Sequence, residues 1–272
     1  MEASKKLNNL IYKLKDMDSV LIAFSGGVDS TFLLKLAHDI LGEKCIAVTI
    51  HTMMHSNREI KEAMEFTKSL GIRHIVLEID KLEINEVIEN VERRCYYCKK
   101  YIFENIKKVA KNYNINYILD GTNLDDLKDY RPGLKALEEL NIKSPLKDCL
   151  LTKDDIRILS KNLKIPTYNK PAFACLATRI PYGEKITNEK LRMVEKGEEY
   201  LQDLGFKQFR VRLHKNLARI EVQESEIDKF FNKNLLKSTY NKFKEIGFEY
   251  VTLDLLGYRM GNMNDNLNQQ ED

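Results

Sequence analysis

The chain has 272 residues, of which 43% are hydrophobic and 31% are charged. This composition is ordinary for a water-soluble globular protein, and the length suits one large or two modest domains. Lys and Arg number 44 against 41 Asp and Glu, and the resulting formal net charge of +3 gives no indication of a nucleic-acid partner.

The N-terminus lacks the apolar core of a secretory signal peptide, and no run approaches the ~18 consecutive apolar residues of a membrane helix. We therefore expect a cytoplasmic protein with no membrane partner. In that compartment the five cysteines should be reduced, so paired cysteines indicate metal binding or catalysis before disulfides.

Over the first 120 residues, short β-branched runs alternate with helical patterns. The runs predict strands at 20–24, 45–50, 74–79 and 117–119, and the patterns predict helices from Thr31, over 57–70 and over 99–113. This alternation is typical of parallel βαβ units with helices on both faces of the sheet. We predict an α/β fold with a doubly wound, mostly parallel sheet.

Between the first strand and the first of these helices lies Ser-Gly-Gly-Val-Asp-Ser, residues 25–30. Two glycines let backbone N–H groups approach an anion, the serines add hydroxyl donors, and the following helix N-terminus is partly positive. The aspartate is suited to Mg²⁺. The run is neither a Walker motif nor a dinucleotide fingerprint. A glycine-rich turn without a ligand is the alternative, but the strand–turn–helix context favours ATP, with the predicted contacts Ala23, Ser25, Gly26, Gly27, Asp29 and Ser30.

Three acidic residues, Asp125, Asp126 and Asp129, follow the end of the fourth predicted strand. Ligands collect at this edge of an open parallel sheet, so the three carboxylates could assist Mg²⁺ or position a substrate. A role in helix capping or at the surface is the alternative for each.

The second half of the chain changes character. Thr152 and Asp155 have capping-box spacing ahead of a helix at 156–163, and helices at 188–204 and 234–246 accompany strands at 208–213, 218–222 and 250–256. We predict a first domain at 1–172, a smaller C-terminal α+β domain at 173–262 and a disordered tail at 263–272.

The cysteines fall into two groups. Cys95 and Cys98 are three residues apart and share a face if they lie on a helix; alone they fit a metal site, a redox pair or coincidence. Cys175, in a loop framed by prolines and glycine, adds a third thiol. Three thiolates suit a catalytic Zn²⁺ or a [4Fe–4S] cluster with one open iron, and the spacing does not choose between them. Cys45 and Cys149 are predicted to be buried.

Along the strand at 208–213 and the residue after it, Arg210, Arg212 and His214 alternate with apolar residues and so share one face. The simple interpretation is a solvated strand face. The alternative is bidentate binding of phosphate or carboxylate by the arginines.

Several motifs, taken in order, resemble the LarE family of the N-type ATP pyrophosphatases. The likeness covers roughly residues 10–260, and its most specific element is the nine-residue motif from Cys175. The motifs are Ser-Gly-Gly-Val-Asp-Ser at 25–30, Gly-Thr-Asn-Leu-Asp-Asp at 121–126, Asp-Tyr-Arg-Pro-Gly at 129–133, Cys-Leu-Ala-Thr-Arg-Ile-Pro-Tyr-Gly at 175–183 and Leu-Ala-Arg-Ile-Glu-Val at 217–222.

This resemblance implies an ATP-dependent sulfur insertase of nickel-pincer nucleotide synthesis. Such an enzyme adenylates the carboxylates of pyridinium-3,5-biscarboxylic acid mononucleotide and converts them to thiocarboxylates, with sulfide or another sulfur donor. One branch of the family sacrifices a single cysteine at the position of Cys175. Another branch has three cysteines and a [4Fe–4S] cluster, so the resemblance implies Cys95, Cys98 and Cys175 as cluster ligands here. It also implies a homo-oligomer.

Further site residues lie inside or beside these motifs. Arg179 and Arg131 suit offsetting phosphate or carboxylate charge. The predicted catalytic residues are Cys175, Arg179 and Asp29; the further ATP contacts are Gly121 and, near the adenine, Thr49; the substrate contacts are Arg210, Arg212, Arg131 and Asp126. A tRNA thiolase and a nucleotide-sensing module without catalysis are the competing hypotheses, and no RNA-binding appendage supports the first.

Overall fold

The computed structural model describes residues 2–79, 84–128, 131–171 and 174–259. The chain divides into two compact units, one comprising Met1–Val87 and Arg93–Phe173 and the other comprising Ile88–Glu92 and Ala174–Asp272. The predicted tail at 263–272, Asp129 and the predicted boundary between residues 172 and 173 lie outside the described residues.

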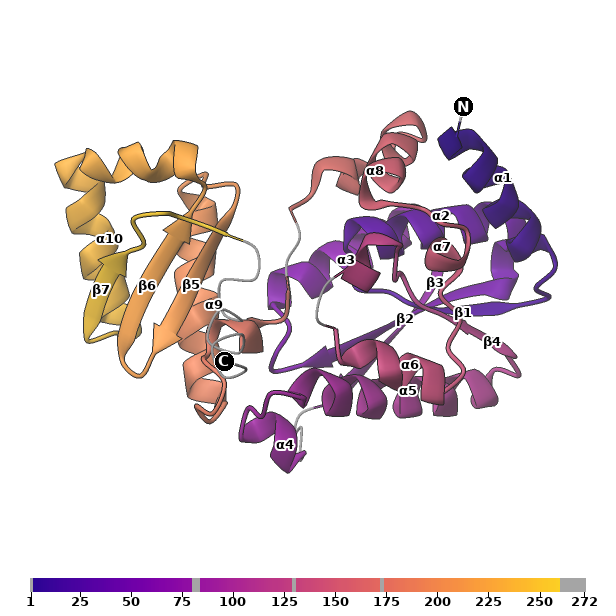
Figure 1. Cartoon of the computed structure of the whole chain (residues 1–272), viewed down its shortest axis with the longest axis horizontal. Helices are drawn as coiled ribbons and strands as arrows, with labels where there is room; N and C mark the ends of the chain where they lie inside the picture. The colour runs from indigo at the N-terminus through magenta and orange to yellow at the C-terminus, as the bar shows by residue number, and fades with distance from the viewer. Residues whose placement is uncertain (1, 80–83, 129–130, 172–173, 260–272) are drawn as a thin grey trace. The chain divides into compact units, whose positions relative to one another are not determined.

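The first unit contains a four-stranded parallel sheet (Figure 1). Its strands are β1 (Val20–Ala23), β2 (Cys45–Thr52), β3 (Arg73–Ile79) and β4 (Tyr117–Leu119), in the order β3-β2-β1-β4. Every neighbouring pair is parallel. The carboxyl ends of β1 and β4 therefore meet at one edge, where ligands bind in folds of this kind. The predicted α/β fold class is confirmed.

Helices cover both faces of this sheet (Figure 1). The longer ones are α1 (Glu2–Lys15), α2 (Val28–Leu41), α3 (Asn57–Ser69), α5 (Arg94–Asn112) and α8 (Lys153–Asn162), and the short ones are α4 (Asn85–Ile88), α6 (Gly133–Glu139) and α7 (Pro145–Asp148). Among the described helices of the chain, none combines the length and apolar character needed to cross a membrane.

Strand alternation in β1 divides the apolar side chains of the unit between two cores. Val20 and Ile22 join the core formed with α1, α2 and α8, whereas Leu21 joins the core formed with α5 and α6. Because both faces are buried, the strands read as continuous apolar runs rather than as an alternating pattern. This arrangement leaves only the strand ends and their loops for polar chemistry.

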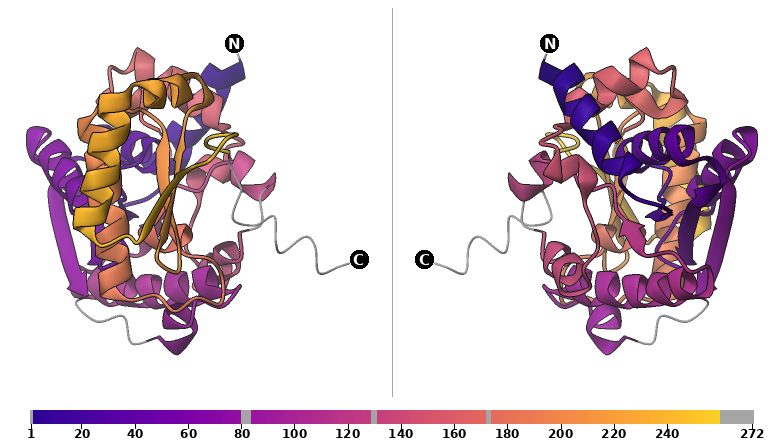
Figure 2. Two further views of the ribbon diagram at one scale, coloured as in Figure 1. Left: turned by 90° about the vertical axis from the view of Figure 1, so that its left-hand side faces the viewer. Right: turned by 90° about the vertical axis from the view of Figure 1, so that its right-hand side faces the viewer.

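The second unit is a smaller α+β arrangement around a three-stranded sheet. Strand β5 (Phe209–His214) is antiparallel to β6 (Leu217–Val222), which is parallel to β7 (Tyr250–Leu253). Helices α9 (Asn188–Asp203) and α10 (Lys233–Ile246) lie together on one face of the sheet (Figure 2). A 3₁₀ turn, η4 (Leu176–Arg179), packs against β5 and α9.

Residues 88–92 belong to the second unit although they interrupt the first in sequence. Asn90 is fully buried with a φ of 56°, in the left-handed region that asparagine tolerates. Its side-chain amide donates to the carbonyls of Ile180 at 3.2 Å, Pro181 at 2.6 Å and Glu184 at 3.1 Å. This one side chain therefore fixes the loop that follows η4.

Candidate functional site

The turn between β1 and α2 forms a cradle suited to an anion. The hydroxyl groups of Ser25 and Ser30 lie 3.0 Å apart, and the Ser30 hydroxyl oxygen lies 3.3 Å from the carbonyl oxygen of Gly27, to which it donates. Gly26 has a φ of +70°, and a Cβ there would lie 3.2 Å from the Cβ of Ala63. Gly27 precedes α2 without a side chain that could cap it, so the N–H groups of the first turn suit an anionic ligand.

Gly121 brings the end of β4 against the start of α2. A Cβ at this position would lie 3.0 Å from the backbone nitrogen of Ser30 and 3.2 Å from its Cα, which is too close for any residue but glycine unless the backbone moves. The preceding carboxylate, of Asp120, is buried and accepts hydrogen bonds from Thr122 and Ser144. The predicted nucleotide contact Gly121 therefore lies directly against the turn at residues 25–30, named the phosphate loop below.

Thr49 uses its side chain to hold the residue that precedes the loop. Its hydroxyl donates to the carbonyl of Phe24 at 2.6 Å and lies 2.7 Å from Nε2 of His74. Because the hydroxyl proton is directed at the carbonyl, Nε2 of His74 is the donor in the second bond, and burial lowers the pKa of that histidine. Ala23 is the half-buried last residue of β1. Contacts of Thr49 and Ala23 with ATP stay predictions.

Asp29, in the first turn of α2, has partners from two distant segments. Its carboxylate accepts from the side-chain amide of Asn123 at 3.3 Å and from the ammonium group of Lys153 at 2.5 Å. Burial raises the pKa of Asp126 above its usual value, and the negative charge of Asp29 acts in the same direction. Two carboxylates that repel each other at a phosphate loop provide the oxygen ligands that Mg²⁺ prefers. Arg131 pairs with Asp126 at 2.9 Å.

Two lysines that the sequence reasoning missed lie at the loop. Lys153 pairs with Asp29, and the ammonium nitrogen of Lys170 lies 3.2 Å from the carbonyl oxygen of Gly26 and 2.8 Å from the carboxylate of Glu62. The contacts to the loop join residues 124 and 144 positions apart in sequence. No local pattern carries such a signal.

Cys95 and Cys98 lie at the start of α5, because this helix begins at Arg94, five residues earlier than predicted. Their spacing places both thiols on one side of the helix, and both are half-buried. Gly133, the first residue of α6, lies against this turn: a Cβ there would meet Cδ of Lys99 at 2.9 Å and the carbonyl oxygen of Cys95 at 3.4 Å.

Cys175 belongs to the second unit and precedes η4. Its thiol is half-buried, and its carbonyl accepts from the hydroxyl of Thr178 at 2.9 Å. Within either unit taken alone, the described residues gather no group of three or more His, Cys, Asp or Glu side chains suited to a metal ion. The set of Cys95, Cys98 and Cys175 draws on both units and stays a prediction. Cys45 and Cys149 are buried, as predicted.

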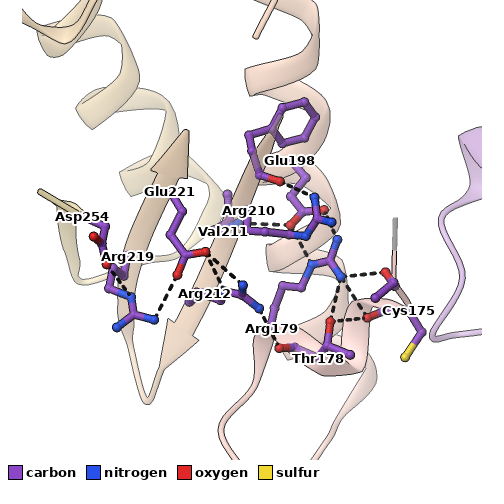
Figure 3. A network of polar contacts seen from close by, with 12 residues as sticks. Cys175, Thr178, Arg179, Glu198, Arg210, Val211, Arg212, Arg219, Glu221 and Asp254 are labelled. Atoms are coloured by element: carbon purple, nitrogen blue, oxygen red, sulfur yellow. Dashed lines mark hydrogen bonds and ion pairs between the residues drawn. The ribbon is translucent and has the colours of Figure 1, made fainter. Parts of the chain in front are cut away.

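A buried network of arginines and carboxylates reaches the backbone at Cys175 through Arg179 (Figure 3). Arg179 is only 1% exposed, and its guanidinium group donates to both carboxylate oxygens of Glu198, at 2.8 and 2.9 Å. The same group donates to the carbonyls of Ala174 at 2.6 Å and Cys175 at 3.0 Å. Arg179 is therefore placed to fix the backbone that carries Cys175.

The arginines of β5 are buried as well. Arg212 donates twice to one oxygen of Glu221, at 2.9 and 3.0 Å, while Arg219 reaches the other oxygen of that carboxylate at 3.0 Å. Arg210 and Arg212 are 3% and 5% exposed, because η4 and α9 pack against β5. The interpretation of this strand face as solvated is wrong.

Burial and neighbouring charges shift the pKa values of two residues in this network. Burial, with the neighbouring positive charge of Arg179 acting in the same direction, lowers the pKa of Arg210 to about 10. The Arg210 guanidinium stacks 4.9 Å from the ring centroid of Tyr258. Burial acts to raise the pKa of Glu198, but attraction to Arg179 prevails and the pKa lies below its usual value. With this pKa the Arg210 guanidinium stays charged at neutral pH, and a guanidinium group suits a phosphate or carboxylate ligand.

Comparisons with known proteins cover the whole chain. A family model described as a PP-loop domain matches residues 1–130. An uncharacterised protein of Synechocystis sp. is 40% identical over 95% of this chain and 97% of its own. The pyridinium-3,5-bisthiocarboxylic acid mononucleotide synthase of Lactiplantibacillus plantarum is 37% identical over 99% of this chain and 97% of its own. One subunit of the glutamine-hydrolysing GMP synthase of Sulfurisphaera tokodaii is 28% identical over 70% of this chain and 56% of its own. The end-to-end likeness to the second of these relatives, together with the phosphate loop at β1 and α2, shows that the chain belongs to the LarE family of PP-loop ATP pyrophosphatases.

Proposed function

We propose that the chain adenylates the carboxylates of pyridinium-3,5-biscarboxylic acid mononucleotide with ATP and converts them to thiocarboxylates. The observation that carries the proposal is the 37% identity, over 99% of the chain, to a synthase of the corresponding bisthiocarboxylic product. Family membership makes the chain an ATP-dependent sulfurtransferase. The substrate and the source of sulfur belong to the proposal.

In the first half-reaction a carboxylate oxygen of the substrate bonds to the α-phosphorus of ATP. The bond from that phosphorus to the α–β bridging oxygen breaks, and pyrophosphate leaves with the electron pair. Ser25, Ser30 and the first-turn N–H groups of α2 are suited to hold the phosphates as the charge moves onto the leaving group. Asp29, with Asp126, is assigned to Mg²⁺, because the negative charge of Asp29 acts to raise the pKa of Asp126 and carboxylate oxygens are the ligands that Mg²⁺ prefers.

In the second half-reaction hydrosulfide attacks the acyl carbon. A carbon–sulfur bond forms, the carbon–oxygen bond to AMP breaks, AMP leaves with the electron pair, and one proton is released. Adenylation is needed because a carboxylate is a poor electrophile, whereas AMP is a good leaving group. A second round converts the other carboxylate.

Cys95, Cys98 and Cys175 are assigned as ligands of a [4Fe–4S] cluster, whose fourth iron would present the sulfide for transfer. The first pair fits such a group, since the two thiols lie one helical turn apart on α5. Arg179 is assigned to position Cys175 through the backbone contacts described above. Sacrifice of the Cys175 sulfur is the alternative source.

The substrate carries a phosphate and two carboxylates, so its binding residues should be cationic. Arg210 and Arg212 on β5 are assigned to these groups, because both are buried and a guanidinium group binds phosphate or carboxylate through two hydrogen bonds. Arg131 and Asp126, beside the phosphate loop, are assigned to orient the reacting carboxylate.

The test begins with anaerobic purification and measurement of iron and acid-labile sulfide per chain. We expect about four of each. Both should be lost in Cys95→Ala, Cys98→Ala and Cys175→Ala. Both should be retained in the control Cys149→Ala, because Cys149 is buried and is not one of the proposed ligands. Incubation with the biscarboxylic mononucleotide, ATP and sulfide should then give thiocarboxylate product by mass spectrometry in more than one turnover.

Two results would change the proposal. Iron-free protein that loses one H₂S per chain during a single turnover, with Cys95 dispensable, would assign the sulfur to Cys175. Iron-loaded wild-type protein that releases no pyrophosphate with this substrate would overturn the proposed reaction.

A further inference from the structure

The phosphate loop supplies no positive charge of its own. From Ser25 to Ser30 the sequence has one charged side chain, the negatively charged carboxylate of Asp29. ATP and pyrophosphate are polyanions, and backbone N–H groups with one Mg²⁺ offset only part of that charge. Walker-type loops include a lysine for this purpose, and this loop has none. The cationic phosphate ligands must therefore come from elsewhere in the chain.

We propose that Lys153 and Lys170 are these ligands and bind the β- and γ-phosphates of ATP and the pyrophosphate that leaves. The inference rests on the proposed use of ATP and assigns residues to it. Both lysines belong to the first unit, and both already contact the loop. The two lysines lie at opposite ends of one segment. Lys153 is the first residue of α8, and Lys170 directly follows the 3₁₀ turn η3 (Pro166–Asn169).

The partners of Lys170 are ones that a phosphate can displace. The carbonyl oxygen of Gly26 is neutral, and the carboxylate of Glu62 belongs to a side chain that is 43% exposed. An ion pair to so exposed a carboxylate is weak, whereas a phosphate oxygen accepts a stronger charge-assisted bond. Lys170 itself is only 16% exposed, so its ammonium group is held at the loop before the nucleotide binds.

The partner of Lys153 changes when Mg²⁺ binds. Without the ion, the lysine neutralises Asp29. A Mg²⁺ ion on that carboxylate would take over this role and repel the ammonium group, and the nearest compensating negative charge would be that of the phosphates. The long lysine side chain can make such a move without a change in the backbone, whose N–H is fixed by Asp125 at 2.8 Å.

The experiment measures binding by calorimetry on the full chain, with Mg²⁺ and three probes: α,β-methylene-ATP, pyrophosphate and AMP. We expect Lys153→Met and Lys170→Met each to weaken binding of the first two probes by about tenfold or more, since a hydrogen bond between charged groups contributes at least that much. Binding of AMP should change by less than about twofold, because AMP lacks the phosphates concerned.

Lys35→Met is the matched control, because Lys35 lies on the same helix as Asp29 but pairs with Asp39. Its affinities should equal those of the wild type. Lys170→Arg should recover part of the affinity for pyrophosphate, as a retained cation would. Far-ultraviolet circular dichroism of each variant checks that the fold is kept.

The possible outcomes separate the two proposals. Failure of the wild type to bind α,β-methylene-ATP would overturn ATP use itself. If the wild type binds this probe and the lysine variants bind it equally well, the assignment of the lysines is wrong. Equal weakening for AMP and the triphosphate would also overturn it, since the lysines would then act on the nucleoside part or on the fold.

Discussion

His55, just after β2, is a residue whose ionisation should limit stability in acid. Its Nδ1 accepts the backbone N–H of Thr52 at 3.3 Å, and burial lowers the pKa of His55 to about 4, with the charge of His51 acting in the same direction. Between about pH 6.5 and pH 4 the unfolded chain therefore binds a proton that the folded chain does not, so stability falls as the pH falls.

For this reason His55→Gln should be less sensitive to acid than the wild type. Between about pH 7 and pH 4.5 the wild type should lose about 2 kcal/mol more free energy of unfolding than the variant, measured by urea denaturation. His51→Gln should keep most of the wild-type dependence, because the burial of His55 is the larger cause. Identical pH profiles for the wild type and His55→Gln would contradict this assignment.

Gly121→Ala tests the contact between the end of β4 and the phosphate loop. The added methyl group would lie 3.0 Å from the nitrogen of Ser30, so the start of α2 must move. We expect a loss of about 1–3 kcal/mol in stability and weaker binding of α,β-methylene-ATP, measured by thermal unfolding and calorimetry. Unchanged nucleotide affinity in a folded variant would show that the loop tolerates the shift.

Residue by residue, the sequence identified what local chemistry dictates. The serines, glycines and aspartate of the loop are contiguous, so their pattern predicts the cradle. Lys153 and Lys170 were not predicted as site residues, because tertiary packing alone brings them to the loop. For Arg210 and Arg212 the sequence leaves a solvated face and a substrate-binding role open, because alternation indicates a shared face but does not tell what covers it; in the structure both are buried.

At the scale of elements, the start of α8 links stability to the site. Thr152 and Asp155 form the predicted capping box, and Lys153 is the first residue of the helix. Thr152→Ala should cost about 1 kcal/mol in stability and also weaken nucleotide binding, because the loosened first turn carries the partner of Asp29.

The matched control is Thr187→Ala at the start of α9, where the hydroxyl accepts from the backbone N–H of Lys190. It should cost a similar amount of stability and leave affinity for α,β-methylene-ATP unchanged. Thermal unfolding and calorimetry measure the two effects separately. Equal affinities in the two variants would show that the helix cap does not affect the site.

The element boundaries were predicted correctly where local caps and chain breaks set them, and incorrectly elsewhere. The capping box of α8 forms as predicted. Strands β1, β2 and β4 begin at the predicted residues. Helix α5 starts earlier than predicted, within a cysteine- and tyrosine-rich stretch that has no capping side chain. Strand β7 ends at Leu253, three residues before the predicted end, and the apolar Leu255 and Leu256 beyond it are exposed.

At the scale of the whole molecule, the path of the chain carries information that the sequence pattern did not. Residues 88–92 leave the first unit and return to it, held in the second unit by Asn90. A single left-handed asparagine gives no sequence signal of such a crossing. The chain therefore passes between the units three times, and Cys95 follows the second passage closely.

Each unit has a buried core of its own, with residues such as Phe32 and Leu34 in the first and Val211 and Phe243 in the second. We therefore expect the metal-free protein to unfold in two calorimetric transitions. The proposed cluster, with Cys95 and Cys98 from one unit and Cys175 from the other as its ligands, would bind only when both units are folded. Loading iron and sulfide anaerobically should raise both midpoints together, because the ligand binds the native state alone. In Cys175→Ala, iron and sulfide should no longer raise the midpoint of the second unit. If the midpoint of only one transition rises in the wild type, one unit holds the iron by itself.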